Sequence, residues 1–148
     1  MLSLTQVGIR SLRSAESEIV DSIDDGNRVM TMGEFHNVGP QGVAGVLPRD
    51  ARTYVSIDID VLDPPLIPGC VSAEPNGMSY AELRDTLAAI ADHCTLVGFD
   101  LVAVNPTLDV RTGVTSYLAA HTVLEFLGNI CRQARWERHR EARAAARS

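Results

Sequence analysis

The sequence contains no lysine, and all thirteen of its basic residues are arginine. This absence excludes mechanisms that depend on lysine, including the phosphate-binding P-loop and Schiff-base catalysis. Cysteine is also scarce, because Cys70, Cys94 and Cys131 are far apart and odd in number. That pattern gives neither a disulfide framework nor a CxxC metal site. We therefore expect three buried thiols.

Long apolar runs are missing as well. No stretch approaches the roughly 18 consecutive apolar residues that a membrane-spanning helix needs. Residues 1–13 lack the basic and then apolar pattern of a targeting peptide. The 148 residues are 45% hydrophobic and 22% charged, which is typical of one soluble globular domain. These features predict a cytoplasmic protein that does not contact a membrane.

Aromatic residues make up only 5% of the chain, and its net charge of −6 is unevenly distributed. Residues 132–148 carry a net charge of +4, which leaves −10 on residues 1–131. A tail rich in arginine, alanine and glutamate is typical of a solvated helix, with an RNA-binding or acidic-partner patch as the alternative. Because the body is acidic and poor in aromatic residues, we expect no nucleic-acid partner. The sequence predicts a domain over residues 1–131 and a basic helical tail over residues 132–148.

Short apolar strands alternate with amphipathic helices along the chain. Strands are predicted over residues 4–9, 28–32, 53–62 and 96–104, and helices over residues 15–23, 79–94 and 115–135, with a shorter helix inside residues 37–48. This order is typical of an α/β fold in which helices cover both faces of a parallel sheet.

Three helices have features that can be checked. Ser79 and Glu82 form a capping-box pattern, followed by apolar residues at helical spacing as far as Cys94. The first helix should end near Gly26 and present one apolar face, made of Ile19, Val20 and Ile23. The last helix should bury a stripe made of Val123, Leu124, Leu127, Ile130 and Cys131.

Two aspartates stand near the end of the third predicted strand. Because side chains alternate along a strand, Asp58 and Asp60 should share one face at the carboxyl edge of the sheet, where α/β proteins place ligands. Two neighbouring carboxylates repel one another, and their hard oxygen atoms suit Mn²⁺ or Mg²⁺. The alternative is that both aspartates end an exposed edge strand and cap the next turn. Asp63 precedes Pro64 and is expected to form a turn.

The same segment resembles the ureohydrolases, the family of arginase, agmatinase and formimidoylglutamase. The resemblance rests on residues 56–64, on Pro68-Gly69, on residues 74–80 and on residues 98–106. It implies an arginase-like three-layer αβα fold, of which this chain is the C-terminal half only. It further implies that Asp58 bridges two Mn²⁺ ions and that Asp60 binds one of them. The metals would hold a hydroxide that attacks a small guanidino or amidine substrate such as agmatine and releases urea.

The sequence departs from the family pattern at three points. Four of the six metal ligands are missing, because neither a Gly-Gly-Asp-His nor an Asp-Ala-His-x-Asp segment occurs, and no histidine stands in a matching motif. Ala103 replaces a glutamate that pairs with the substrate guanidinium, and a methyl group cannot form that pair. Asn76 replaces the first glycine of a Gly-Gly pair, which is tolerable because asparagine accepts left-handed backbone angles.

These departures predict an incomplete site in a gapped sheet. In the family, a strand of the missing half lies between the strands that correspond to residues 4–9 and 53–62. The chain is then either an incomplete enzyme or a non-catalytic fragment of a split ureohydrolase, with the missing N-terminal half or further copies of itself as partner. A second alternative is a haloacid-dehalogenase-like phosphatase, because Asp58-Ile-Asp60 fits its nucleophile motif. That motif normally opens a domain, and this chain has no lysine for the phosphoryl group.

Overall fold

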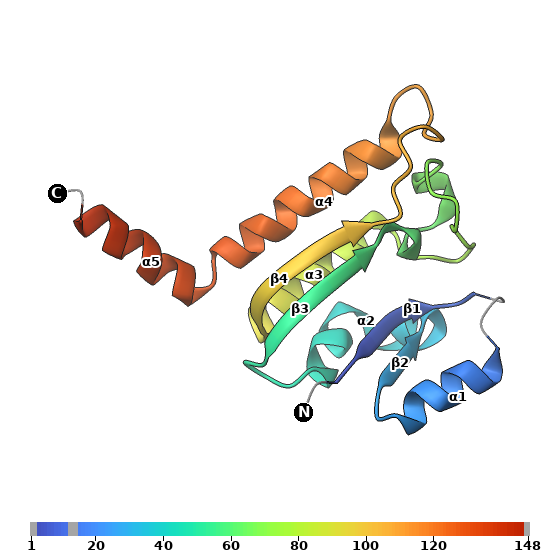
Figure 1. The fold of residues 1–148 in the computed structure, drawn as a ribbon, viewed down its shortest axis with the longest axis horizontal. Helices are drawn as coiled ribbons and strands as arrows, with labels where there is room; N and C mark the ends of the chain where they lie inside the picture. Colours follow the sequence, from blue (N-terminus) through green and yellow to red (C-terminus); the bar gives the residue numbers. More distant parts are fainter. Residues whose placement is uncertain (1–2, 12–14, 147–148) are drawn as a thin grey trace.

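The computed structural model describes residues 3–11 and 15–146, which contain two pairs of parallel strands (Figure 1). β1 (Thr5–Ile9) pairs with β2 (Arg28–Thr31), and β3 (Arg52–Asp58) pairs with β4 (Thr95–Val102). Within the described residues, the two pairs share no strand ladder. The expected gap between the first and third strands is therefore confirmed.

Helices pack on both sides of these strands. They are α1 (Glu16–Asp24), α2 (Met32–Val46), α3 (Tyr80–His93), α4 (Val114–Cys131) and α5 (Ala134–Ala145). In Figure 1, α2 and α3 lie side by side behind the strands, and α1 lies on the near side of the β1–β2 pair. The predicted α/β fold with parallel strands is confirmed, and so is its incompleteness. Among the described residues, no helix is long and apolar enough to cross a membrane.

Helix α3 begins as its sequence predicts. The Ser79 hydroxyl accepts a hydrogen bond from the Glu82 amide at 3.3 Å, and the Glu82 carboxylate accepts one from the Ser79 amide at 2.8 Å. These bonds satisfy amide groups that the first turn of a helix otherwise leaves without partners. The predicted apolar face is buried in full, at Leu83, Leu87, Ile90, Ala91 and Cys94.

Helix α2 is longer than predicted. It starts at Met32, inside the segment assigned to the second strand, because Thr31 and Glu34 form a second capping box. Gly39 interrupts the helix with φ of 64°, and the following Pro40 disfavours helical angles at the residue before it. The Thr31-x-x-Glu34 pattern was present in the sequence and could have located this start.

The buried face of α4 differs from the predicted stripe. Of the five predicted residues only Ile130 is buried, whereas Leu124 is 68% exposed and Leu127 is 40% exposed. The buried stripe consists of Thr115, Ala119, Thr122, Phe126 and Ile130. The predicted stripe left out Ala119 and Phe126 as well as the threonines, whose hydroxyl groups can be satisfied inside the helix. The Thr122 hydroxyl, for example, donates to the Leu118 carbonyl at 2.8 Å.

Two further expectations need correction. The last helix does not continue to residue 135, because α4 ends at Cys131 and α5 begins separately at Ala134. Only one of the three cysteines is buried: Cys94 is buried, Cys70 is half-buried and Cys131 is exposed. Cys131 is exposed because it lies on the side of α4 that faces away from the core.

The hydrophobic core lies between the strands and the α2–α3–α4 layer. Its fully buried side chains include Phe35, Ile59, Leu62 and Phe126, and the ring of Phe99 packs edge-on against Phe126 at 5.0 Å between centroids. Helix α1 lies outside this core. Its predicted apolar face is only partly covered, because Ile19 is half-buried whereas Val20 and Ile23 are about half exposed, at 48% and 51%.

Candidate active site

Asp58 and Asp60 lie at the carboxyl end of β3, but they are not on one continuous strand. β3 ends at Asp58, and Ile59–Val61 form a short 3₁₀ helix. The predicted alternation is therefore wrong beyond Asp58. The Asp58 carboxylate accepts a hydrogen bond from the Asp60 amide at 3.0 Å, so it caps this turn. The backbone here follows the alternative interpretation, in which an aspartate at the strand end caps the next turn. The carboxylate oxygens of Asp58 and Asp60 can still accept further bonds.

The electrostatic setting of Asp58 favours a neutral group or a cation nearby. Partial burial raises the pKa of Asp58, and the neighbouring Asp60 carboxylate raises it further, whereas the hydrogen bond from the Asp60 amide opposes this shift. A carboxylate whose charged form is disfavoured binds a proton more readily and gains from an adjacent positive charge. The pair is therefore suited to holding a cation, although that role is a prediction.

Residues 56–64 and 74–80, two of the segments that carry the family resemblance, pack against one another. The Asp63 carboxylate accepts a hydrogen bond from the Gly77 amide at 3.0 Å, so Asp63 forms a turn as expected. A Cβ atom on Gly77 would lie 2.6 Å from the Leu62 carbonyl carbon, which requires glycine there. Asn76 adopts the left-handed conformation with φ of 60°, as anticipated. These contacts explain why the family motif continues into residues 74–80.

Arg10 is a site residue that the sequence interpretation missed. Its Nη2 donates to the carbonyls of Asp60 at 2.6 Å and of Glu74 at 2.7 Å, and its Nε donates to the Pro75 carbonyl at 3.1 Å. The guanidinium thus connects the end of β1 to residues 56–64 and to residues 74–80. Its place directly after a strand, at the carboxyl edge of a parallel sheet, was a signal that could have identified it.

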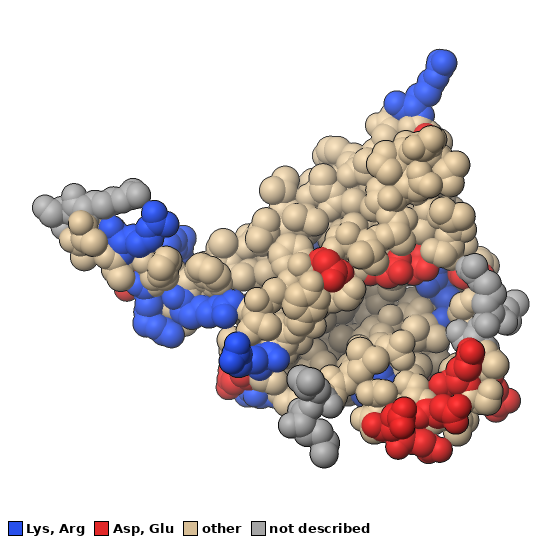
Figure 2. All heavy atoms as spheres, viewed as in Figure 1, with Lys and Arg blue, Asp and Glu red and all other residues tan. Residues whose placement is uncertain are grey.

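A pocket of about 280 Å³ opens beside this arginine. It is lined by Gly8, Ile9, Arg10, Ser11, Asp60, Ser72 and Glu74. Figure 2 shows that the molecule is hollowed between its two strand pairs. The pocket therefore lies where the gap in the sheet meets one of the two aspartates.

Ala103, at the position of the family glutamate, lies at the same edge. It directly follows Val102, the β4 residue that pairs with Asp58. Its backbone is left-handed, with φ of 68°, and its side chain is exposed. The methyl group brings neither a charge nor a hydrogen-bonding group to this edge.

Asp100 is a third carboxylate on the face of the β3–β4 pair that carries Asp58, and it was also missed. It accepts hydrogen bonds from the Ser56 hydroxyl at 2.7 Å and the Tyr54 hydroxyl at 2.8 Å. The bond from Ser56, followed by the bond from Tyr54, lowers the pKa of Asp100, and the same carboxylate raises the pKa of Tyr54. Both Asp100 oxygens thus accept a hydrogen bond from a side chain of β3.

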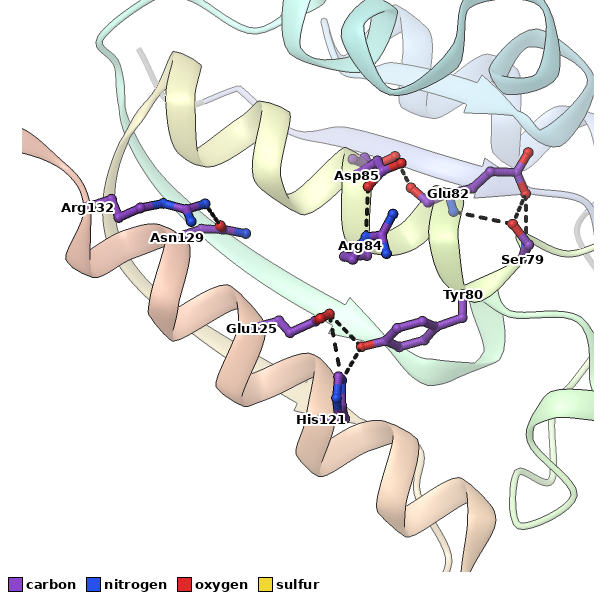
Figure 3. A network of polar contacts seen from close by, with 10 residues as sticks. Ser79, Tyr80, Glu82, Arg84, Asp85, His121, Glu125, Asn129 and Arg132 are labelled. Carbon is purple, nitrogen blue, oxygen red and sulfur yellow. Dashed lines mark hydrogen bonds and ion pairs between the residues drawn. The ribbon is translucent and has the colours of Figure 1, made fainter.

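The four histidines, His36, His93, His121 and His139, do not supply the missing ligands. His93 Nε2 lies 2.9 Å from the Leu47 carbonyl oxygen. The Tyr80 hydroxyl donates to the Glu125 carboxylate at 2.7 Å and lies 2.7 Å from His121 Nδ1 (Figure 3). Burial, followed by the bond to Glu125, raises the pKa of Tyr80 to about 12. This network joins the start of α3 to the middle of α4.

The donor set at the end of β3 is suited to only some of the positions of a metal centre. Two aspartates provide oxygen atoms that suit Mn²⁺ or Mg²⁺. Within residues 3–11 and 15–146, however, no group of three or more His, Cys, Asp or Glu side chains could hold a metal ion. The described residues therefore fit only part of a metal centre.

Comparison with known proteins decides the family. The sequence profile of the Arginase family matches residues 2–128. The chain belongs to the arginase family. It is 33% identical over 136 residues to proclavaminate amidinohydrolase from Streptomyces clavuligerus, a match that covers 90% of this chain and 43% of that protein. It is also 33% identical over 133 residues to formimidoylglutamase from Halalkalibacterium halodurans, covering 86% and 41% of the two chains.

Solved structures of this family share the fold. The Streptomyces clavuligerus enzyme superposes with a TM-score of 0.78 at 34% identity, over 86% of this chain and 43% of that one. Formimidoylglutamase from Bacillus subtilis gives a TM-score of 0.78 at 29% identity, over 88% and 42%. The chain thus spans about two fifths of the length of these relatives, and membership of the arginase family removes the phosphatase alternative.

Proposed function

We propose that this chain supplies the carboxylate-bearing part of a ureohydrolase-type active site. In its complete form, that site would hydrolyse a C–N bond of a small guanidino or amidine compound with the help of two Mn²⁺ ions. The observation that carries the proposal is the placement of Asp58 and Asp60 at the carboxyl end of β3, with Asp60 lining the pocket at the gap. The names of the relatives, which include an amidinohydrolase and an agmatinase, support the reaction class.

The chain's own residues would prepare the site rather than complete it. Arg10 fixes the Asp60 backbone through its bond to the carbonyl oxygen, which limits where the Asp60 carboxylate can reach. The Asp63–Gly77 bond holds the following loop against the same segment. Because no three candidate ligands come together among the described residues, we expect the remaining ligands to come from a second polypeptide segment. The isolated chain should then not hydrolyse agmatine or arginine.

The experiment supplies that segment. The chain is expressed with the N-terminal part of a homologous agmatinase that carries the two histidine motifs, and urea release from agmatine is measured with Mn²⁺ present. We expect urea release only when the two polypeptides are expressed together, which we call the pair. Asp58→Asn and Asp60→Asn should each abolish the activity of the pair. Asp92→Asn, an exposed substitution on α3, should leave it unchanged. Urea release by the chain alone would contradict the proposal.

Ala103→Glu tests the substrate contact within the same pair. A charge-assisted pair with a guanidinium is worth about 1.5–3 kcal/mol, so the substitution should lower KM for agmatine by at least tenfold. An active pair that does not respond to Ala103→Glu would indicate an uncharged amidine substrate or an anchor elsewhere. A folded pair that stays inactive with either residue would instead favour a non-catalytic assembly partner.

A further inference from the structure

A second pocket lies at the opposite end of β3 and β4 from Asp58 and Asp60. Its volume is about 500 Å³, within the range of roughly 300–1,000 Å³ that is typical of small-molecule sites. The loop before β3, the end of α3, the start of β4 and the junction between α4 and α5 form its walls (Figure 1). Because the eight residues of β4 extend about 26 Å, substitutions in this pocket should not alter the carboxyl edge of the strands.

Side-chain hydrogen bonds hold the walls of this pocket together. Gln133, between α4 and α5, donates through Nε2 to the carbonyls of Ala91 and Cys94, at 2.7 Å each. The Arg135 guanidinium donates to the Leu96 carbonyl. These bonds fix the α4–α5 junction against the end of α3 and the start of β4. The pocket is therefore formed before any ligand enters, which lowers the entropic cost of binding.

Charges of both signs line the pocket without pairing with one another. The basic side chains are Arg132, Arg135 and Arg138, and the acidic ones are Asp50 and Asp92. Among the described residues, no ion pair joins either of these carboxylates to any of the three guanidinium groups. A molecule that carries both negative and positive groups would satisfy both sets.

Two buried polar atoms of the same walls have no hydrogen-bond partner within the part of the chain that the structure describes. They are an acceptor, Gln133 Oε1, and a donor, Arg135 Nε. A buried polar atom without a partner costs free energy, and such atoms mark places where a water molecule or a ligand group is bound. One donor and one acceptor are needed here, which again favours a ligand that offers both.

The basic side of the pocket comes from a segment that the family profile does not match. That profile ends at residue 128, whereas Arg132, Gln133, Arg135 and Arg138 follow it. The pocket is thus separate from the candidate active site in position and in sequence. An inference about it does not depend on the proposed function.

We propose that this pocket binds an acidic amino acid, a molecule with two carboxylates and one ammonium group. Arg132 and Arg138 bind the carboxylates through charge-assisted hydrogen bonds, and the Asp50 carboxylate accepts one from the ammonium group. Arg135 keeps its bond to the Leu96 carbonyl and holds the wall. The charges also balance, because three arginines and two aspartates leave one positive charge and the ligand carries one negative charge.

Calorimetry on the isolated chain in dilute salt tests the ligand class. The probes are L-aspartate and L-glutamate, each compared with its analogue that lacks the amino group, succinate and glutarate. The amino acid should bind about fivefold more tightly than its analogue, because only its ammonium group can reach Asp50. The absence of binding heat at ~10 mM of every probe, or equal affinities within both pairs, would overturn the proposal.

Substitutions in the pocket test the two kinds of contact separately. Asp50 has a left-handed φ of 58°, which asparagine accepts, so Asp50→Asn should fold. It should weaken binding of the amino acid about fivefold without weakening that of its analogue. Arg138→Gln should weaken binding of both. Circular dichroism checks that each variant is folded.

The matched controls are Asp24→Asn and Arg111→Gln, which change exposed residues outside the pocket and should leave both affinities unchanged. A folded Asp50→Asn protein that binds the amino acid as before would contradict the proposal. Inorganic phosphate that binds as tightly as the amino acid would show a site for anions in general, with the same consequence.

Discussion

Ala103 is held in a backbone conformation that alanine rarely adopts. Left-handed angles cost an L-residue about 1–2 kcal/mol, and glycine escapes this cost but loses about 0.5–1 kcal/mol more in chain entropy. Ala103→Gly should therefore raise the free energy of unfolding by about 0.5–1 kcal/mol, as measured by urea denaturation. Asn76→Gly is the matched control, because asparagine already accepts its φ of 60° and should gain little. A less stable Ala103→Gly protein would show that the alanine methyl makes compensating contacts.

Asp58 gives a stability effect that depends on pH. Its folded-state pKa is raised by burial and by Asp60, so the native protein binds this proton more tightly than the unfolded chain does. The resulting stability is present below the unfolded pKa and is lost as the pH rises through the folded pKa. Asp58→Asn keeps an acceptor for the Asp60 amide and removes the charge, so it should be more stable than the unaltered chain at pH 7. The difference should disappear in acid; a constant difference in denaturation midpoint from pH 3 to pH 7 would contradict this assignment.

At the scale of elements, the start of α3 could be predicted because its signal is local. Ser79 and Glu82 satisfy each other's backbone groups within one turn, so their spacing alone located α3. The end of β3 could not be predicted in this way. The alternation of apolar and polar residues in the sequence continues past Asp58. In the structure, however, the Asp58 carboxylate accepts a hydrogen bond from the Asp60 amide and caps a 3₁₀ helix that begins at Ile59. The threonines on the buried face of α4 were missed because of a similar contact between side chain and backbone. A threonine hydroxyl that donates to a carbonyl of its own helix can be buried among apolar groups.

The capping box of α3 can be tested directly. Ser79→Ala removes the hydroxyl that accepts from the Glu82 amide, and loss of such a cap costs about 1 kcal/mol. For a chain of this size, that should lower Tm by about 3 °C in a thermal melt. Ser17→Ala, an exposed change in α1, is the control and should leave Tm within about 1 °C. Equal effects of the two substitutions would show that the cap adds nothing to the stability of α3.

At the scale of the whole molecule, the sequence predicted the gap in the sheet but missed two residues near its carboxyl edge, Arg10 and Asp100. Residues 56–64, 74–80 and 98–106 identified the family, and the absent histidine segments predicted the gap between β1 and β3. Arg10 and Asp100 were missed because each acts through residues about 45 to 65 positions away. Such contacts depend on which strands become neighbours. The local pattern places Arg10 after a strand, but it does not give the partners of either residue. The metal role of Asp58 and Asp60 stays a prediction.

Metal binding by the isolated chain tests that prediction. Two carboxylates leave most positions around Mn²⁺ to water, so we expect a Kd on the order of 0.1–1 mM by calorimetry. Because protons compete for Asp58, the affinity should fall as the pH is lowered toward the raised pKa of this residue. Asp58→Ala should abolish the binding heat, whereas Asp92→Asn should not change it. Submicromolar affinity that survives Asp58→Ala would mean that the metal ligands lie elsewhere in the chain.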